Sequence, residues 1–485
     1  MNLRVLRVML VIIAAGVFAL TALHAQQAPP NGPPVQIQAP DAQNFQSIQQ
    51  PQQAQPAATN EPEVLTRGPV HEAFATPTTE PVPTTPVPKA PPAPLEEMPP
   101  DQKPEGDVTW IKGYWGWDED RKDYIWVSGV WRNVPPGKTW VAGYWKDDSG
   151  QYRWVPGFWT AAQENQAQQV TYLAAPPAAP TVAPPGKPPT DDSFYVPGSW
   201  YWNGERYVWQ AGYWAHVQPG YVWVPGHYRW TPGGFIYIAG YWDVAIANRG
   251  VMYAPVYVDP YIVRPGFVYV PAYAVPETVV IDTLFVRPCY CHYYYGDYYG
   301  VVYRERGFES CIVYSNRCYD PVYSYVRWEH RSDPTWVNVH VDLYLGRQAG
   351  RYECPPRTLV EARVWAARNP GARVDFVVPA AHLELATRMR TVHVEATARE
   401  AYRSHAVVVQ RAAVERSRAE FGGAPRPGFG PRTVALSVPA THPAGYAATS
   451  HVNTVRPNTV GQRPPPPRQP VRRPPPKNEK DEKKK

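Results

Sequence analysis

The feature that most constrains the fold is a short phrase, Trp-Val-x-Gly-x-Trp, which recurs with its glycine always in the same slot. Its eight copies start at residues 110, 126, 140, 154, 195, 209, 223 and 237. Aromatic and β-branched runs bounded by Gly, Pro, Asn and Asp predict strands joined by tight turns. We therefore expect a mostly β protein in which residues 107–160 (block 1) and 193–243 (block 2) each form a four-stranded antiparallel meander.

The glycine of each copy is predicted to be structural. In a flat strand the first and sixth positions of the phrase point to opposite faces. A β-bulge at the x–Gly step would bring both rings to one face; alternatively, the glycine leaves room for a ring from the neighbouring strand. In either case a β-carbon there should destabilise the sheet. The eight repeat glycines are Gly113, Gly129, Gly143, Gly157, Gly198, Gly212, Gly226 and Gly240.

The many tryptophans have two explanations. Paired rings gain roughly 0.5–1.5 kcal/mol beyond their burial, so aromatic ladders can stabilise a thin sheet that lacks a thick core. Exposed rings on a flat sheet could instead stack on the apolar face of a sugar, and tandem repeats would add multivalency. The candidates for such glycan stacking are Trp209, Tyr213, Trp214, Trp223 and Tyr228.

The two ends of the chain and the stretch between the blocks differ from the repeats. A basic start followed by an apolar run predicts a signal peptide over residues 1–25, and hence export to the periplasm, cell envelope or extracellular space. Residues 26–106 are rich in Pro and Gln and contain no Trp, Tyr or Cys, which predicts a disordered linker. We expect a second, Pro/Ala-rich linker over 161–192 and a disordered, Pro-rich basic tail over 423–485.

The charge of the chain is concentrated in that tail. The formal net charge is +6, and residues 463–485 carry nine Lys or Arg against three Asp or Glu. The rest of the chain is therefore balanced, which argues against a nucleic-acid groove. The tail could contact an envelope polysaccharide or another anionic surface, and exposed sheet edges, or a cysteine left unpaired by the odd count of five, could mediate self-association.

Residues 244–355 are rich in tyrosine and contain every cysteine, and we expect a further β domain there. In an exported chain the default state of cysteine is the disulfide, and Cys311 and Cys318 are close enough in sequence to staple a hairpin. A zinc site on Cys289, Cys291 and His292 is an alternative that no paired CxxC spacing supports. The candidate disulfide cysteines are Cys289, Cys291, Cys311, Cys318 and Cys354.

Residues 356–422 are predicted to be helical. Thr358 and Glu361 form a capping-box pattern that opens a helix ending at about Arg368. A second helical stretch, broken or loosely packed, covers roughly 396–420.

The phrase resembles the WXXGXW repeat, also written YXWGXW, of BcpO-related bacterial proteins. The resemblance covers the two blocks and implies an exported protein of a family with no established activity. Residues 244–340 are also similar to the region that follows these repeats in large secreted members. The supporting stretches are ANRGVMYAPVYVDP, RPCYCHYYYGDYYG and YDPVYSYVRWEHR, although the cysteines depart from the expected pattern.

The sequence contains no GxSxG, HExxH, Gly-rich phosphate loop or EF-hand loop, the motifs that would indicate common catalytic or ion-binding sites. We therefore expect a protein that is not an enzyme and has no cofactor or metal. The predicted function is a non-catalytic β-repeat scaffold, structural or for assembly, in the cell envelope. The alternative is binding of carbohydrate or a cell-wall polymer through aromatic stacking.

Overall fold

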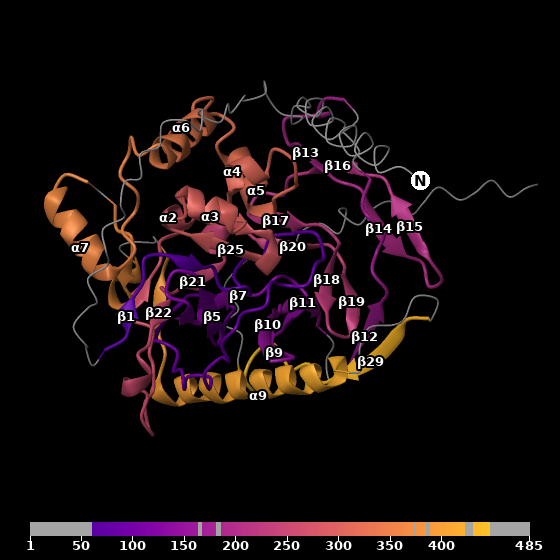
Figure 1. Ribbon diagram of the computed structural model, residues 1–485, viewed down its shortest axis with the longest axis horizontal. Helices are drawn as coiled ribbons and strands as arrows, with labels where there is room; N and C mark the ends of the chain where they lie inside the picture. Colours follow the sequence, from indigo (N-terminus) through magenta and orange to yellow (C-terminus); the bar gives the residue numbers. More distant parts are fainter. Residues whose placement is uncertain are drawn as a thin grey trace, which may run out of the picture.

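The computed structural model describes residues 61–162, 167–180, 186–372, 374–384, 389–421 and 430–446. Antiparallel strands dominate this part of the chain, so the mostly β prediction is confirmed. Figure 1 shows the strands at the centre, the short helices on one side, and the long helix α9 (Ala396–Glu420) lying across the other side. The predicted signal peptide and most of the predicted basic tail lie outside the described residues.

The repeats pair two at a time. Each repeat consists of two short strands separated by the x–Gly step, and two consecutive repeats form one long hairpin with an outer and an inner ladder. Hairpin 1 contains β4 (Val108–Ile111), β5 (Tyr114–Asp118), β6 (Asp123–Val127) and β7 (Val130–Asn133). Hairpin 2 contains β8 (Lys138–Val141), β9 (Tyr144–Asp148), β10 (Gln151–Val155) and β11 (Phe158–Ala161).

Block 2 repeats this arrangement. Hairpin 3 contains β13 (Ser193–Val196), β14 (Ser199–Trp202), β15 (Tyr207–Gln210) and β16 (Tyr213–His216). Hairpin 4 contains β17 (Tyr221–Val224), β18 (His227–Thr231), β19 (Gly234–Ile238) and β20 (Tyr241–Val244). The predicted four-stranded meanders are therefore wrong. In block 1 the reason is that the outer edge of β7, which a meander would offer to β8, pairs with β21 (Gly250–Met252).

The x–Gly step interrupts both strands of a hairpin at the same level. In hairpin 1, Trp110 is opposite Trp131 in the outer ladder, and Trp115 is opposite Trp126 in the inner ladder. The same number of residues lies between the two ladders on each strand, so no residue is inserted. The predicted bulge is therefore wrong, because a bulge places two residues of one strand opposite one of the other.

The alternative explanation of the glycine, room for a neighbouring ring, is confirmed. A β-carbon at Gly129 would lie 2.4 Å from Cζ2 of Trp110, and one at Gly157 would lie 2.4 Å from Cζ2 of Trp140. The eight repeat glycines have no positive φ, so the backbone angle does not require glycine there. The close approach of the neighbouring ring is what leaves no room for a side chain. The first and sixth rings of paired repeats pack together with centroids 5.1–5.6 Å apart, in the pairs Trp110–Trp131, Trp115–Trp126, Trp140–Trp159, Trp145–Trp154, Tyr195–Trp214, Trp200–Trp209, Trp223–Trp242 and Tyr228–Tyr237.

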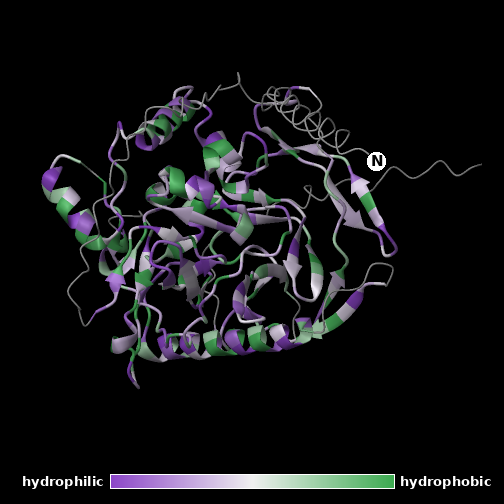
Figure 2. Cartoon of the chain, in the orientation of Figure 1, coloured by the Kyte–Doolittle hydropathy of each residue, from purple (hydrophilic) through white to green (hydrophobic). Residues whose placement is uncertain are grey.

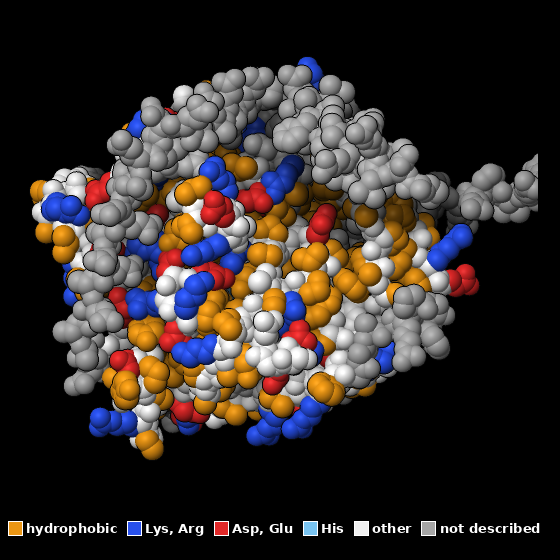
Figure 3. Space-filling model, viewed as in Figure 1, with side chains coloured by type: hydrophobic (Ala, Val, Ile, Leu, Met, Phe, Trp, Pro, Cys, Tyr) orange, Lys and Arg blue, Asp and Glu red, His pale blue; other side chains and the backbone are white. Residues whose placement is uncertain are grey.

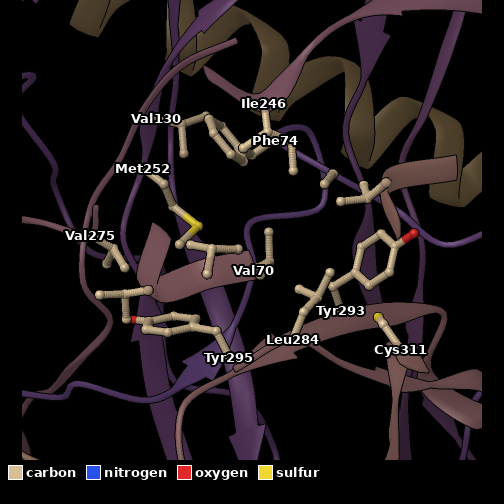
Figure 4. Packing of buried hydrophobic residues seen from close by; sticks show 14 of the residues in the cluster. Val70, Phe74, Val130, Ile246, Met252, Val275, Leu284, Tyr293, Tyr295 and Cys311 are labelled. Atoms are coloured by element: carbon tan, nitrogen blue, oxygen red, sulfur yellow. The ribbon is translucent and has the colours of Figure 1, made fainter. Parts of the chain in front are cut away.

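Residues 61–106, which we call the strap, are ordered, so the prediction of disorder is wrong for them. The strap contains β1 (Glu63–Val64), β2 (Gly68–Pro69) and β3 (Gln102–Pro104). Val70 and Phe74 are fully or almost fully buried in the largest hydrophobic cluster, where Figure 4 shows them near Val130. The strap cannot form a core alone, but its few apolar side chains fill gaps between segments that can.

Residues 244–355 are not a separate β domain, which corrects the prediction. Their early strands β21 and β22 (Val256–Tyr257) extend the sheets of hairpin 1, and much of the remainder is helical. The strands are β23 (Tyr273–Ala274), β24 (Phe285–Arg287), β25 (His292–Tyr295) and β26 (Glu309–Ser310). The α-helices are α2 (Glu277–Asp282), α3 (Val301–Glu305), α4 (Cys311–Tyr314), α5 (Pro321–Glu329) and α6 (Trp336–Gln348), and the 3-10 helices are η1 (Ile246–Asn248), η2 (Pro260–Ile262) and η3 (Pro288–Tyr290).

The two predicted helices after residue 356 are confirmed. Helix α7 (Leu359–Arg368) begins at the expected cap, where the Thr358 side chain accepts from the amide of Glu361. Helix α9 is continuous rather than broken, and Figure 2 shows hydrophobic and hydrophilic residues alternating along it. Its buried Tyr402 and Ala406 pack in the cluster that contains Trp110. The short elements of this region are β27 (Val378–Pro379), η4 (Ala380–His382) and β28 (Thr391–His393).

A segment expected to be a linker and a segment expected to be disordered both form strands. In the predicted linker, β12 (Gln168–Leu173) pairs with β19 of hairpin 4, and its other edge pairs with β29 (Arg432–Leu436) of the predicted tail. Buried Tyr172 and Leu436 share a cluster with Ile236. The segments lack cores of their own, and the sheet of hairpin 4 provides the surface on which they order.

Candidate functional site

The site with the most specific geometry lies at the x–Gly step of hairpin 1, where a glutamate of the strap enters the gap between the two ladders. One carboxylate oxygen of Glu97 accepts from the amide of Gly113 at 2.7 Å. The other accepts from the amide of Gly129 and from the indole Nε1 of Trp126, both at 2.9 Å. The x–Gly step leaves these amides without strand partners, and the carboxylate satisfies them.

Hairpin 2 holds a second strap glutamate in the same way. Glu72 Oε2 accepts from the amide of Gly157 at 3.0 Å and from Trp154 Nε1 at 3.2 Å. In both hairpins the donors are the first ring and the glycine of the second repeat. We call this set, with the glycine of the first repeat, the carboxylate cradle.

The carbonyl groups of the interrupted step in hairpin 2 are satisfied by α9. Arg416 Nη1 donates to the carbonyl oxygens of Ala142 and Pro156, each at 3.0 Å. The same guanidinium pairs with Glu420 at 2.8 Å, and both side chains are buried. Hairpin 2 is thus held by the Glu72 carboxylate, which accepts from the amide of Gly157, and by Arg416, which donates to two carbonyl oxygens.

Burial dominates the titration of both cradle glutamates. It raises the pKa of Glu97 above its ordinary value, while the amides of Gly113 and Gly129 lower it. Burial raises the pKa of Glu72 to about 7, against the opposing hydrogen bonds from Gly157 and Trp154. The Glu72 carboxyl therefore changes charge near neutral pH.

A cluster of neutral polar side chains surrounds Glu72. His292 Nδ1 lies 2.7 Å from the carbonyl oxygen of Tyr290, so it carries the proton, and Nε2 accepts from the Tyr114 hydroxyl at 2.8 Å. That hydroxyl accepts from the amide of Glu72 at 3.1 Å. Burial lowers the pKa of His292 to about 4. These hydrogen-bonding groups are therefore satisfied by one another and by the backbone, and they hold the neighbouring segments together.

His71 makes the same kind of link to hairpin 1. Its Nδ1 accepts from the amide of Ala73, and its Nε2 donates to the carbonyl oxygen of Lys112, each at 3.1 Å. Burial lowers the pKa of His71 to about 3, so the ring is neutral at physiological pH.

A cavity of about 70 Å³ lies between hairpin 1, hairpin 2 and α9. Glu72, His71 and Tyr114 line it together with rings of both hairpins and His405 of α9. This volume holds a few water molecules.

The structure places the five predicted glycan-stacking residues unevenly. Tyr228 is 6% exposed and packs between Tyr207 and Tyr237, so it has no free face for a sugar and this part of the prediction is wrong. The other four are partly exposed, and three of them pair with a ring across the hairpin. These four are Trp209, Tyr213, Trp214 and Trp223.

The five cysteines are free thiols, which corrects the disulfide prediction. Cys311 begins helix α4 and is buried in the main cluster, whereas Cys318 follows that helix. The segment between them is a helix and turn instead of the hairpin that a staple would require. Cys289 lies within η3, Cys291 is the residue that follows η3, and Cys354 lies in the loop after α6.

No group of three His, Cys, Asp or Glu side chains in the described ranges could hold a metal ion, and this includes Cys289, Cys291 and His292. No helix in the same ranges is long and apolar enough to span a membrane.

Neither cradle glutamate was identified from the sequence, because a Glu in a proline-rich stretch carries no motif. A signal does exist. Ala90-Pro91-Pro92-Ala93 precedes block 1, and Ala175-Pro176-Pro177-Ala178 precedes block 2. The duplication indicates that part of the strap belongs to the repeated unit and is therefore expected to be ordered.

Comparison with protein families matches the hairpins one by one. The model "WXXGXW repeat (2 copies)" matches residues 107–135, 136–160, 194–215 and 219–243. The chain carries the WXXGXW repeat. Each match covers one hairpin, so the two copies in the WXXGXW model correspond to the two strands that pair. A search of curated proteins and a search of solved structures gave no match.

Proposed function

We propose that this WXXGXW protein is a non-catalytic scaffold of the cell envelope, in which the two-repeat hairpins are rigid units for assembly. The observation that carries the proposal is the pairing of the first and sixth rings in all four hairpins. Rings paired in this way stabilise the hairpins themselves. Export and a contact between the basic tail and an anionic surface complete the proposal.

The polar cluster around Glu72 also favours a non-catalytic role. Catalysis would require a nucleophile or base that can reach a substrate. His71, Tyr114 and His292 are instead tied to one another or to backbone groups. We therefore assign them to the attachment of the strap and hairpins.

Carbohydrate binding is the second candidate, and the partial exposure of block 2 favours it. Trp209 and Trp214 are half-buried, so an edge or part of a face of each ring could contact a sugar. Both rings also pair across hairpin 3, which is why scaffolding remains the main proposal.

Two parallel assays on the full chain test the proposal. Cross-linking in intact envelopes should give protein–protein links that map to block 2, and isolated envelope polysaccharide should leave the tryptophan emission unchanged. An emission change on adding polysaccharide that Trp214→Phe removes, without protein links in block 2, would contradict the scaffold and support glycan binding.

A further inference from the structure

Hairpin 3 retains the donors of a carboxylate cradle. Gly198 and Gly212 occupy the positions that Gly113 and Gly129 occupy in hairpin 1, and Trp209 occupies the position of Trp126. A β-carbon at Gly129 would meet a carboxylate oxygen of Glu97 at 2.8 Å. Hairpins 1 and 3 therefore have the same set of cradle donors.

Within the described part of the chain, no carboxylate accepts a hydrogen bond from the amides of Gly198 and Gly212. The three atoms nearest to a β-carbon at Gly198 belong to Trp209 and Gln210, and those at Gly212 belong to Tyr195 and Val196. The Tyr195 hydroxyl is the nearest atom at Gly212, and it adds a hydrogen-bonding group to the cradle.

The two blocks have equivalent proline-rich segments packed on them. In hairpin 1, Trp115 Nε1 donates to the carbonyl oxygen of Ala93 at 2.9 Å. In hairpin 3, the equivalent Trp200 Nε1 donates to the carbonyl oxygen of Ala178 at 3.1 Å. The two segments thus make the same contact with their hairpins.

The sequences diverge at the residue that supplies the carboxylate. Glu97 follows Ala93 by four positions, and the residue four positions after Ala178 is Val182. Block 2 has therefore kept the donors while its own proline-rich segment has no acidic residue at the corresponding position.

Hairpin 4 does not share this property. The first ring of its second repeat is Tyr237 instead of tryptophan, so the indole donor is missing. The Tyr237 hydroxyl lies 2.3 Å from the position of a β-carbon at Gly226. Hairpin 3 is thus the one hairpin of the four in which an intact donor set faces no carboxylate of the described residues.

Hairpin 3 is also accessible. Pro197 and Ala211, the residues before its two repeat glycines, are exposed, and so are Tyr201 and Val208 of its inner ladder. Figure 1 shows β14 and β15 at the edge of the molecule, and Figure 3 shows hydrophobic side chains gathered over this region. Exposed apolar residues around unused donors are typical of an interaction surface.

We propose that hairpin 3 docks an extended, proline-flanked segment of a partner protein through one glutamate, whose carboxylate accepts from Gly198, Gly212 and Trp209. Both occupied cradles favour a peptide, because each takes a glutamate from the proline-rich strap of this chain. This inference rests on the scaffold proposal and specifies the partner that a scaffold would hold.

The test uses the full chain and a capped peptide of its own residues 94–100, PLEEMPP, with a matched peptide in which Glu97 is replaced by Gln. Calorimetry and tryptophan emission should give saturable binding of the first peptide. The Gln peptide should bind about tenfold to a hundredfold more weakly, since hydrogen bonds to a charged group contribute about 1.5–3 kcal/mol.

Two protein variants locate the site. Trp209→Phe should weaken the PLEEMPP peptide several-fold by removing one donor, whereas Trp223→Phe in hairpin 4 should leave its affinity unchanged. Equal affinity of the Glu and Gln peptides, or no binding at millimolar concentration, would overturn the proposal. Binding of glucuronate in the absence of peptide binding would overturn it in favour of an acidic sugar. Cross-links of block 2 in the envelope test the scaffold separately, so the two failures are distinguishable.

Discussion

Hairpins 1 and 3 carry the same repeat with the same ring pairs and glycines, yet one is core and the other is surface. In hairpin 1, Trp110, Trp126 and Trp131 are at most 1% exposed, and Glu97 fills the x–Gly step. In hairpin 3 the corresponding rings are partly exposed. The repeat thus specifies a hairpin, while the segment packed across it determines whether that hairpin is buried.

The largest expected effect is the loss of the Glu97 carboxylate. Glu97→Ala leaves the amides of Gly113 and Gly129 and the Trp126 indole buried without an acceptor, and should lower the free energy of unfolding by about 4 kcal/mol. Chemical denaturation of the full chain measures this. The neighbouring Glu96 is the matched control: it is exposed and pairs with Arg403, so Glu96→Ala should cost less than about 1 kcal/mol. If both variants lowered the free energy of unfolding by a similar amount, Glu97 would contribute no more to stability than a surface carboxylate, which would contradict the role of the cradle.

The repeat glycines should differ between the blocks. In Gly129→Ala the added methyl group meets the buried Trp110 ring at 2.4 Å and the carbonyl oxygen of Ile111 at 2.7 Å, and we expect a loss of about 3 kcal/mol. Gly212→Ala should lose about 1 kcal/mol, because the half-exposed hairpin 3 can adjust. Thermal melting compares them, with Gly371→Ala as control, since nothing lies within 4 Å of a β-carbon there. A larger loss for Gly212→Ala would contradict the account.

The first ring of the second repeat gives a third comparison. Trp126→Phe removes a fully buried indole that donates to Glu97 and should cost about 2 kcal/mol. Trp209→Phe changes a half-buried ring and should cost well under about 1 kcal/mol. Denaturation midpoints of the two variants, compared at equal m-values, measure these losses. A larger loss for Trp209→Phe than for Trp126→Phe would contradict the prediction.

Part of this arrangement could be predicted from the sequence. The spacing of Trp and Gly located the hairpins, the ring contact at the glycine was one of two explanations considered, and the cap at Thr358 placed α7 correctly. The repeat phrase does not encode which edges pair, because the pairing of β7 with β21 depends on residues about 120 positions later. The order of the strap was missed for a physical reason: Val70 and Phe74 are buried by contacts with distant segments, which local composition cannot reveal.

The smallest expected effect is the contribution of the strap residue Glu72 to the pH dependence of stability. The Glu72 pKa is raised from 4.5 to about 7 in the folded state, so between these values the folded chain binds more protons than the unfolded chain. Glu72 therefore stabilises the fold increasingly as the pH falls from 7 to 6, by about 1 kcal/mol. The neutral His71 and His292 act in the opposite direction. The Glu72→Gln variant lacks this gain. When the pH falls from 7 to 6, its free energy of unfolding should therefore drop by about 1 kcal/mol relative to that of the unmodified chain, as measured by denaturation at both pH values. Parallel pH profiles would show that Glu72 does not titrate there.

The most direct test of the central claim is hydrogen exchange at the repeat glycine amides in the native protein. We expect slow exchange at Gly113, Gly129 and Gly157, fast exchange at Gly198 and Gly212, and selective loss of protection at Gly113 and Gly129 in Glu97→Gln. Equal protection of the glycines in hairpins 1 and 3, or no change at Gly113 and Gly129 in that variant, would contradict it.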